Sequence, residues 1–170
     1  CASDIAVSGT MRVASTLQAP RVRTLTSAGH LGSINVGGTI KARISLADST
    51  NLYLFKPSGG SALSTVGDST ATDGFASNGW TTIYNDSLTV LDSDVAELGN
   101  VSLGFGTNLG TLQFAHGGHI APGDSLVGIG WVRGDLVNDG TIAIPNGLLN
   151  MAGHLTSLTG RILGTSGLVF

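Results

Sequence analysis

The sequence predicts an all-β fold of the solenoid class, and three observations support this prediction. Short apolar segments alternate with polar residues at a period of two, which is the pattern of β-strands. No apolar pattern holds the helical period of about 3.6 residues beyond two turns; the best helical candidate, residues 92–98, is short and ends at Gly99. A triplet of glycine, one small or polar residue and one aliphatic residue recurs along the chain.

The composition also favours strands and turns. Of the 170 residues, 41% are hydrophobic and only 11% are charged, against about 25% charged residues in an average globular domain. Exposed helices carry Glu and Lys on their solvent face, whereas this chain uses Ser, Thr, Asn, Asp and the small residue Gly. A chain of this length forms one core, so we expect a single domain, residues 1–170.

The strongest alternation lies in the first third of the chain and again after residue 79. The predicted strands are Ile5–Val7, Met11–Val13, Val22–Leu25, Ile34–Val36, Ile40–Ile44, Leu52–Phe55, Trp80–Tyr84 and Leu88–Leu91. Residues 57–79 are dense in turn formers and poor in large apolar side chains, which predicts an irregular loop or excursion. Long loops are frequent positions for binding surfaces.

The glycine triplet is densest in the second half, where it begins at Gly110, Gly118, Gly134, Gly140, Gly153 and Gly160. Residues 134–152 align with residues 153–170, which places Gly134 on Gly153, Gly140 on Gly160 and Gly147 on Gly167. The triplet also occurs at Gly9 and Gly29, which are 20 residues apart.

A repeat of this kind matches the needs of a β-solenoid coil, which has three short strands in roughly 20 to 25 residues. Glycine supplies the corner, and the aliphatic residue two positions later points into the stack. Roughly seven coils, stacked at about 4.8 Å, would form a rod about 30 Å long.

Three segments carry a family resemblance: residues 118–125 (GHIAPGDS), 129–136 (IGWVRGDL) and 138–142 (NDGTI). They resemble passenger regions of autotransporter-like and other large secreted bacterial proteins. Residues 32–40 (GSINVGGTI) look like a unit of long repetitive surface proteins. The resemblance implies a right-handed parallel β-helix, export, and a role as adhesin, stalk or display scaffold. Residues 57–97 fit no repeat, and a β-sandwich pilin-like subunit is the alternative fold.

Several partners and compartments are disfavoured. The net charge is −3 and no run of basic residues exists, so nucleic acid is not an expected partner. No apolar run reaches the roughly 18 residues of a membrane span. Cys1 is the only cysteine, which leaves no internal disulfide. Cys1 fits the lipid-bearing first residue of a mature bacterial lipoprotein, or equally the boundary of a fragment.

We predict no catalytic site, no cofactor and no metal site. His116 and His119 lie three residues apart near Asp124, but strand positions three apart face opposite sides and no third nitrogen or sulfur ligand follows. A second acidic group lacks the sequence patterns of known calcium loops; it consists of Asp86, Asp92, Asp94 and Glu97.

The expected function is therefore structural: an extracellular or cell-surface β-solenoid segment, of bacterial type, that builds or extends a fibre or adhesin. Self-association, or contact with neighbouring segments of the same protein, would occur at the open ends of the solenoid. The terminal apolar residues expected there are Ile5, Val7, Met11, Val13, Leu168, Val169 and Phe170.

Three alternatives stay open at this point. The first is a module that binds surface glycans through aromatic side chains, for which the candidates are Trp80, Tyr84 and Trp131. The second is a carbohydrate-active β-helix enzyme, although paired carboxylates in one groove are not evident. The third is a filament subunit that donates a strand to its neighbour.

Overall fold

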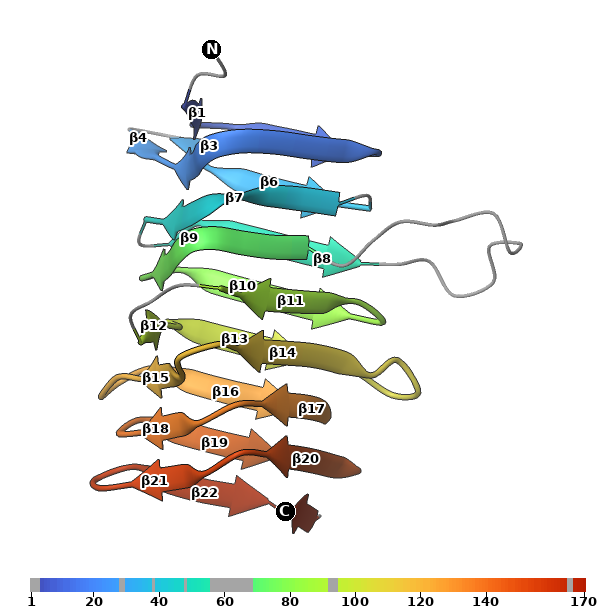
Figure 1. Ribbon diagram of the computed structural model, residues 1–170, viewed down its shortest axis with the longest axis vertical. Coiled ribbons are helices and arrows are strands. Elements are labelled where there is room, and N and C mark those ends of the chain that lie inside the picture. The colour runs from blue at the N-terminus through green and yellow to red at the C-terminus, as the bar shows by residue number, and fades with distance from the viewer. Residues whose placement is uncertain are drawn as a thin grey trace.

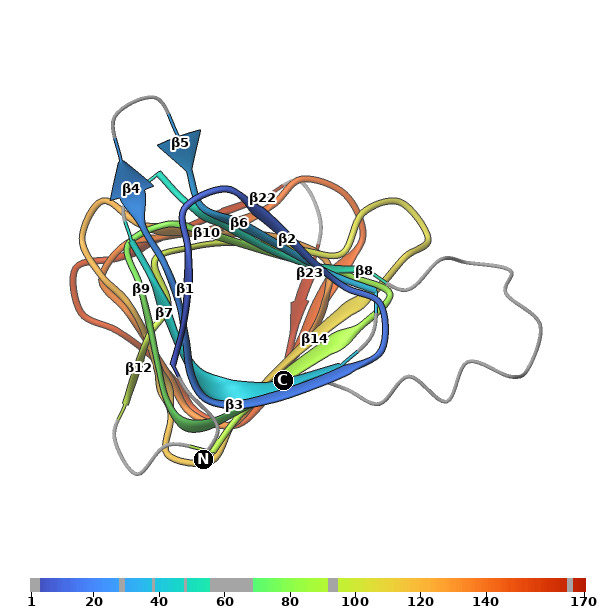
Figure 2. The ribbon, with the colours of Figure 1, turned by 90° about the horizontal axis from the view of Figure 1, so that it is seen from above.

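The computed structural model describes residues 4–27, 30–37, 39–47, 49–55, 69–91, 95–164 and 167–170. These residues contain strands and turns and no helix, and the strands wind into a parallel β-solenoid of about seven turns (Figure 1). Seen from the N-terminal end, the chain runs clockwise as it recedes from the viewer, which is a right-handed coil (Figure 2). The predicted all-β solenoid is confirmed. The alternative β-sandwich is wrong, because successive coils pair in parallel.

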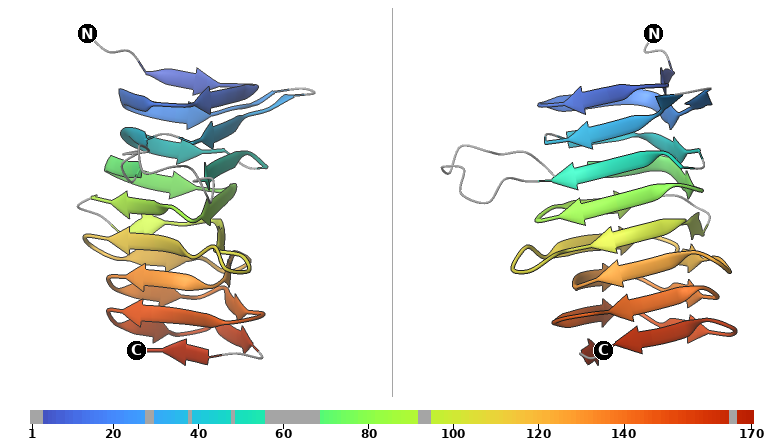
Figure 3. Two further views of the ribbon diagram at one scale, coloured as in Figure 1. Left: turned by 90° about the vertical axis from the view of Figure 1, so that its right-hand side faces the viewer. Right: turned by 180° about the vertical axis from the view of Figure 1, so that it is seen from behind.

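The rod has three faces, and the first is a sheet of eight parallel strands. In order along the rod these are β2 (Thr10–Val13), β6 (Ser33–Val36), β8 (Asn51–Phe55), β10 (Trp80–Tyr84), β13 (Asn100–Leu103), β16 (Ser125–Gly128), β19 (Thr141–Ile144) and β22 (Arg161–Gly164). Figure 3 shows these strands stacked one above the other along the whole rod.

The second and third faces belong to one bent sheet. Three long strands span both faces: β3 (Thr16–Thr24), β7 (Thr39–Leu46) and β9 (Ser69–Ser77). The second face continues with β11 (Ser87–Val90), β14 (Gly110–Phe114), β17 (Gly130–Arg133), β20 (Leu148–Ala152) and β23 (Gly167–Val169). The third face comprises β1 (Ile5–Val7), β12 (Ala96–Glu97), β15 (Gly118–Ile120), β18 (Leu136–Asn138) and β21 (Leu155–Ser157).

Alternate side chains of every face point inward and form ladders along the rod axis. On the first face, one ladder joins eight register partners: Met11, Ile34, Leu52, Thr81, Val101, Leu126, Ile142 and Ile162. Its six internal members are at most 1% exposed. Such ladders fill the interior with aliphatic side chains, and burial of this apolar surface is the main force that holds the coils together.

Close backbone approach explains why glycine occupies several corners. Gly128 and Gly130 flank the corner between β16 and β17, with φ angles of +135° and +138°. A Cβ atom on Gly128 would overlap the carbonyl oxygen of Leu103 in the preceding coil, and one on Gly130 would overlap that of Gly110. Only glycine accepts both the φ angle and the contact.

The segment NDGTI, on which part of the family resemblance rests, forms another corner. Asn138 is fully buried and donates from its amide to the carbonyl oxygen of Arg161 in the next coil (3.3 Å). The Thr141 amide donates to the carbonyl oxygen of Asp124 in the previous coil (3.0 Å). Ile142 then enters the core. The motif therefore joins three successive coils.

Of the predicted irregular loop at residues 57–79, the structure describes residues 69–79, and most of these form a strand that belongs to a repeating coil. Ser69–Ser77 is strand β9, which pairs with β7, β11 and β12. The next three strands, β10 to β12, complete a regular coil. The alternation is weak in β9 because most of its residues are small. Residues 56–68 lie outside the described residues.

Two glycine alignments were also wrong in register. Gly167 pairs with Leu148 and not with Gly147. Thr10, which follows Gly9, pairs with Ser33, whereas His30–Leu31 is strand β5 of a small antiparallel hairpin with β4 (Thr26–Ser27). The coils differ in length from 16 to 29 residues between partners of the first-face ladder, because their turns differ. An alignment that assumes one fixed repeat length therefore loses the register between coils.

Candidate functional site

The two end coils expose the edge of the core. Among the first-face partners, Ile142 is fully buried but Ile162 in the last coil is 46% exposed. Five further inward residues of the end coils are only partly buried, whereas their register partners one coil further in are at most 1% exposed. They are Ile5, Met11 and Leu17 at the N-terminal end, and Leu155 and Leu168 at the C-terminal end.

The predicted assembly residues therefore divide into two groups. Ile5, Met11 and Leu168 point toward the core from an end coil and keep part of their surface exposed. Val169 and Phe170 are 43% and 77% exposed. Val7 and Val13 are only 6% and 7% exposed, so they serve the core more than an end surface.

The structure does not bring the three candidate aromatic residues together. Trp80 and Tyr84 lie on β10 of the first face, whereas Trp131 lies on β17 of the second face. The Tyr84 hydroxyl shares a 3.1 Å hydrogen bond with the Ser102 hydroxyl, and its ring lies 6.4 Å from that of Phe105. A single aromatic platform made of all three residues does not exist.

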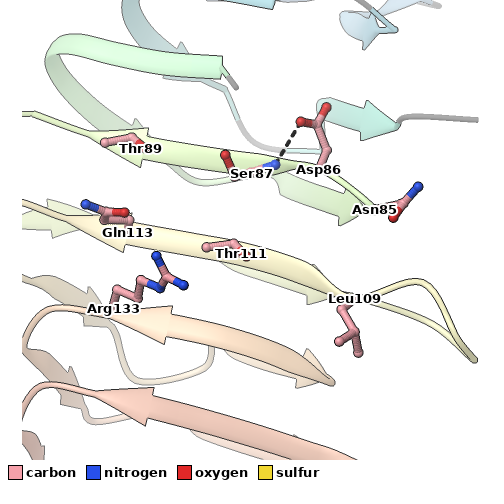
Figure 4. Close-up of a pocket in the computed structure, with 8 residues that line it drawn as sticks. All are labelled: Asn85, Asp86, Ser87, Thr89, Leu109, Thr111, Gln113 and Arg133. Atoms are coloured by element: carbon pink, nitrogen blue, oxygen red, sulfur yellow. Dashed lines mark hydrogen bonds between the residues drawn. The ribbon is translucent and has the colours of Figure 1, made fainter. Parts of the chain in front are cut away.

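An open polar groove of about 300 Å³ lies on the second face (Figure 4). Outward side chains of three successive strands line it, together with the turns that precede β11 and β14. We call this set the polar groove; it comprises Asn85, Asp86, Ser87, Thr89, Leu109, Thr111, Gln113 and Arg133. Parallel register places Ser87 beside Thr111, and Gln113 beside Arg133.

Trp131 adjoins the polar groove through two neighbours. It pairs in register with Thr111, and the Arg133 guanidinium carbon lies 5.5 Å from the centre of its ring. At this distance the guanidinium interacts with the π face of the indole. Trp131 is 38% exposed, so its ring remains accessible next to the groove.

A charged cluster occupies the third face and its corner with the first. The His119 Nδ1 lies 2.9 Å from Glu97 Oε2, and Nε2 lies 3.3 Å from Asp139 Oδ2. Glu97 and His119 are register partners on β12 and β15, and Asp139 follows β18. The three side chains come from three successive coils, so the cluster cross-links them.

The surroundings shift the pKa values of this cluster. The hydrogen bond to Glu97 raises the pKa of His119, with further support from Asp139 against partial desolvation. Desolvation acts to raise the pKa of Asp139, but hydrogen bonds from Thr159 and His119 outweigh it and lower that pKa overall. Burial, followed by the charge of Glu97, raises the pKa of the neighbouring Asp124.

The His and Asp residues considered as metal ligands lie in different parts of the chain. His116 is exposed in the turn before β15 and takes no part in the cluster around His119. Within the described part of the chain, no group of three or more His, Cys, Asp or Glu side chains is arranged to hold a metal ion. Asp92 and Asp94 of the acidic group, and the lipidation candidate Cys1, lie outside the described residues.

The sequence does contain a signal for the charged cluster. Glu97, His119 and Asp139 are 22 and 20 residues apart, which is the length of one coil. The polar groove has a similar but weaker signal, because Ser, Thr and Gln occur at many outward positions.

The described residues thus form a parallel β-solenoid that has partly exposed end coils, a polar groove on the second face and a charged cluster on the third. No protein-family model, curated protein or solved structure matches the chain in comparisons with each. Among the described residues, no helix is long and apolar enough to span a membrane.

Proposed function

We propose that this protein is a structural segment of an extracellular fibre or adhesin, and that it extends the fibre by stacking coil on coil at its ends. The observation that carries this proposal is the exposure of core positions in the last coil, above all Ile162, whose buried partner Ile142 is covered by that same coil. A further coil on top of Ile162 would restore the burial that every internal coil has.

The backbone supports the same arrangement. Among the described strands, the last ones on the three faces, β21, β22 and β23, each pair with a strand on one side only. The first strands, β1, β2 and β3, begin the same three faces at the opposite end. Strands with an unpaired edge recruit another strand. The N-terminal end of one rod therefore matches the C-terminal end of another, in parallel register and in head-to-tail order.

An extracellular location is part of this proposal. It is supported by the likeness of residues 118–142 to passenger regions of secreted bacterial proteins. The proposal requires no catalytic chemistry.

Sedimentation velocity over a concentration series tests the stacking. The parent chain is expected to associate reversibly, and Ile162→Lys is expected to remain monomeric, because a charge would be buried at the junction. Leu158→Lys is the matched control: Leu158 is 75% exposed in the turn between β21 and β22, so this variant should associate like the parent. Association of Ile162→Lys at parental strength, or a parent that stays monomeric, would contradict the proposal.

A further inference from the structure

The structure points to a second function on the side of the rod: we propose that the polar groove binds an acidic oligosaccharide, a linear sugar chain that carries carboxylate groups. This inference does not depend on end stacking, since the groove lies on the second face and involves coils in the interior of the rod.

The lining suits a polyhydroxylated ligand. Ser87 and Thr89 on β11, and Thr111 and Gln113 on β14, present hydroxyl and amide groups outward (Figure 4). These groups both donate and accept hydrogen bonds, as sugar hydroxyls do. The strands repeat at about 4.8 Å along the rod, which is of the same order as the length of one sugar ring. Successive rings of a linear chain can therefore meet equivalent polar groups.

Charge selects an acidic sugar over a neutral one. Arg133 makes no ion pair with the described part of the chain, and its side chain reaches from β17 toward Thr111 and Gln113 (Figure 4). A guanidinium offers paired N–H donors in the geometry that a carboxylate accepts. Among the described residues no carboxylate pairs with this guanidinium, so a carboxylate of the ligand can pair with it.

The two ends of the polar groove differ, which gives the ligand a direction. Asp86 lies at the end opposite Arg133 (Figure 4), is 5% exposed, and accepts a hydrogen bond from the Ser87 amide at 2.8 Å. A carboxylate of the ligand is favoured beside Arg133, and its neutral hydroxyl groups are favoured toward Asp86.

Trp131 adds an apolar surface at the Arg133 end. Trp131 is 38% exposed, its register partner on β14 is the groove residue Thr111, and the Arg133 guanidinium lies over its ring. The C–H face of a sugar ring packs well against an indole, which supplies contact area without a competing polar group. The guanidinium is already positioned by the indole, so less side-chain entropy is lost when a carboxylate binds.

Tryptophan fluorescence tests the site, because the chain has only two tryptophans, Trp80 and Trp131. Trp80→Phe leaves Trp131 as the only reporter, and Trp131→Phe leaves Trp80, which is similarly exposed on the other face. The probes are a linear oligomer of galacturonic acid and a neutral galactose oligomer of equal length. The acidic oligomer is expected to change the fluorescence of Trp80→Phe and to leave that of Trp131→Phe unchanged.

Two arginine variants distinguish binding at the polar groove from nonspecific electrostatic attraction to the protein surface. Arg133→Gln is expected to weaken binding of the acidic oligomer by at least about tenfold, measured by calorimetry. Arg43→Gln on β7 removes the same charge from an exposed position outside the groove and should have no effect. Both variants should sediment like the parent, so that failure of this site and failure of end stacking are distinguishable.

Four results would overturn the proposal. They are equal affinity for the neutral oligomer, equal loss of binding in Arg133→Gln and Arg43→Gln, a response of Trp80 instead of Trp131, and no binding of the acidic oligomer to the parent chain.

Discussion

Gly128 shows at the scale of one residue why this fold needs glycine at its corners. The φ angle of +135° is rare for residues with a side chain, and a Cβ would collide with the backbone of the preceding coil. Gly128→Ala is expected to lower the free energy of unfolding by more than about 2 kcal/mol, measured by urea denaturation.

Gly37→Ala is the control for this corner. An added Cβ at Gly37 would meet nothing within 4 Å, and Gly37 has no positive φ angle. Its effect should stay within about 0.5 kcal/mol. Equal effects of the two substitutions would contradict the account of the corner.

Thr81 carries a hydroxyl where the first-face ladder otherwise has aliphatic side chains. It is fully buried between Leu52 and Val101, and its Oγ1 has no hydrogen-bond partner among the described residues. Thr81→Val keeps the shape and removes the unsatisfied group, so the free energy of unfolding should rise by about 1 kcal/mol.

Thr50 provides the matched comparison in a chemical denaturation series. It is also fully buried, but its hydroxyl donates to the carbonyl oxygen of Ala47 (2.6 Å) and is hydrogen-bonded to the Thr24 hydroxyl. Thr50→Val should therefore destabilise the protein by about 1–3 kcal/mol. Shifts of the same sign in both variants would refute this assignment.

His119 makes the stability depend on pH. Its folded-state pKa is raised above 6.5, so its contribution is present below 6.5 and is lost as the pH rises through the folded-state value. The pKa of Asp139 is lowered below 3.8, so its contribution is present above 3.8 and is lost as the pH falls through the folded-state value. The charged cluster should therefore stabilise the folded protein most between about pH 3.8 and pH 6.5.

Comparison of the parent with His119→Gln in urea measures this effect. The raised pKa of Asp124 has the opposite sign to that of Asp139, but Asp124 is present in both proteins and largely cancels in the difference. The difference in unfolding free energy should be larger at about pH 5 than at about pH 8. A difference that grows with pH would show that the imidazolium does not stabilise the fold.

At the scale of the strand, position along the rod decides how much a core residue contributes. Ile142 on β19 and Ile162 on β22 are register partners with the same side chain, but they are 0% and 46% exposed. Ile142→Ala should lower the free energy of unfolding by about 2–5 kcal/mol, and Ile162→Ala should lower it clearly less. Thermal and urea unfolding of dilute protein compare the two, and equal costs would contradict the open end.

The predictability of the strands follows the strength of their alternation. Ile34–Val36 and Trp80–Tyr84 were predicted and lie in β6 and β10, because β-branched or aromatic residues alternate there with polar ones. Ser69–Ser77 was missed, because its small residues give no alternation and its pairing with long strand β7 defines it. The prediction of the fold class did not depend on this strand, because the remaining coils gave enough signal for a solenoid.

The candidate sites were harder to predict than the strands. The polar groove gathers Ser87, Thr111 and Arg133 from three coils, and each residue is ordinary in its own segment. Only the register between coils of unequal length makes them neighbours. The exposed apolar residues of the end coils, in contrast, could be predicted from the apolar segments near both termini. The burial of Val7 and Val13 could not, because it depends on their inward orientation within the first coil.

For the whole molecule, stacking predicts growth in one dimension only. Eight strands on the first face, spaced by about 4.8 Å, make each rod about 35 Å long. Small-angle scattering over a concentration series should show a constant cross-section and a maximum dimension that grows in steps of about this length. A cross-section that widens with concentration would indicate side-by-side association instead.

The most direct test of head-to-tail stacking is a mixing experiment with one blocked end per chain. Ile162→Lys blocks the C-terminal end, and Met11→Lys blocks the N-terminal end, where Met11 is partly exposed and pairs with Ile34. Each variant alone should be monomeric in sedimentation velocity, because neither can join a free N-terminal end to a free C-terminal end of its own kind. An equimolar mixture should form dimers and nothing larger; a mixture that stays monomeric, or longer assemblies in either variant alone, would contradict the account.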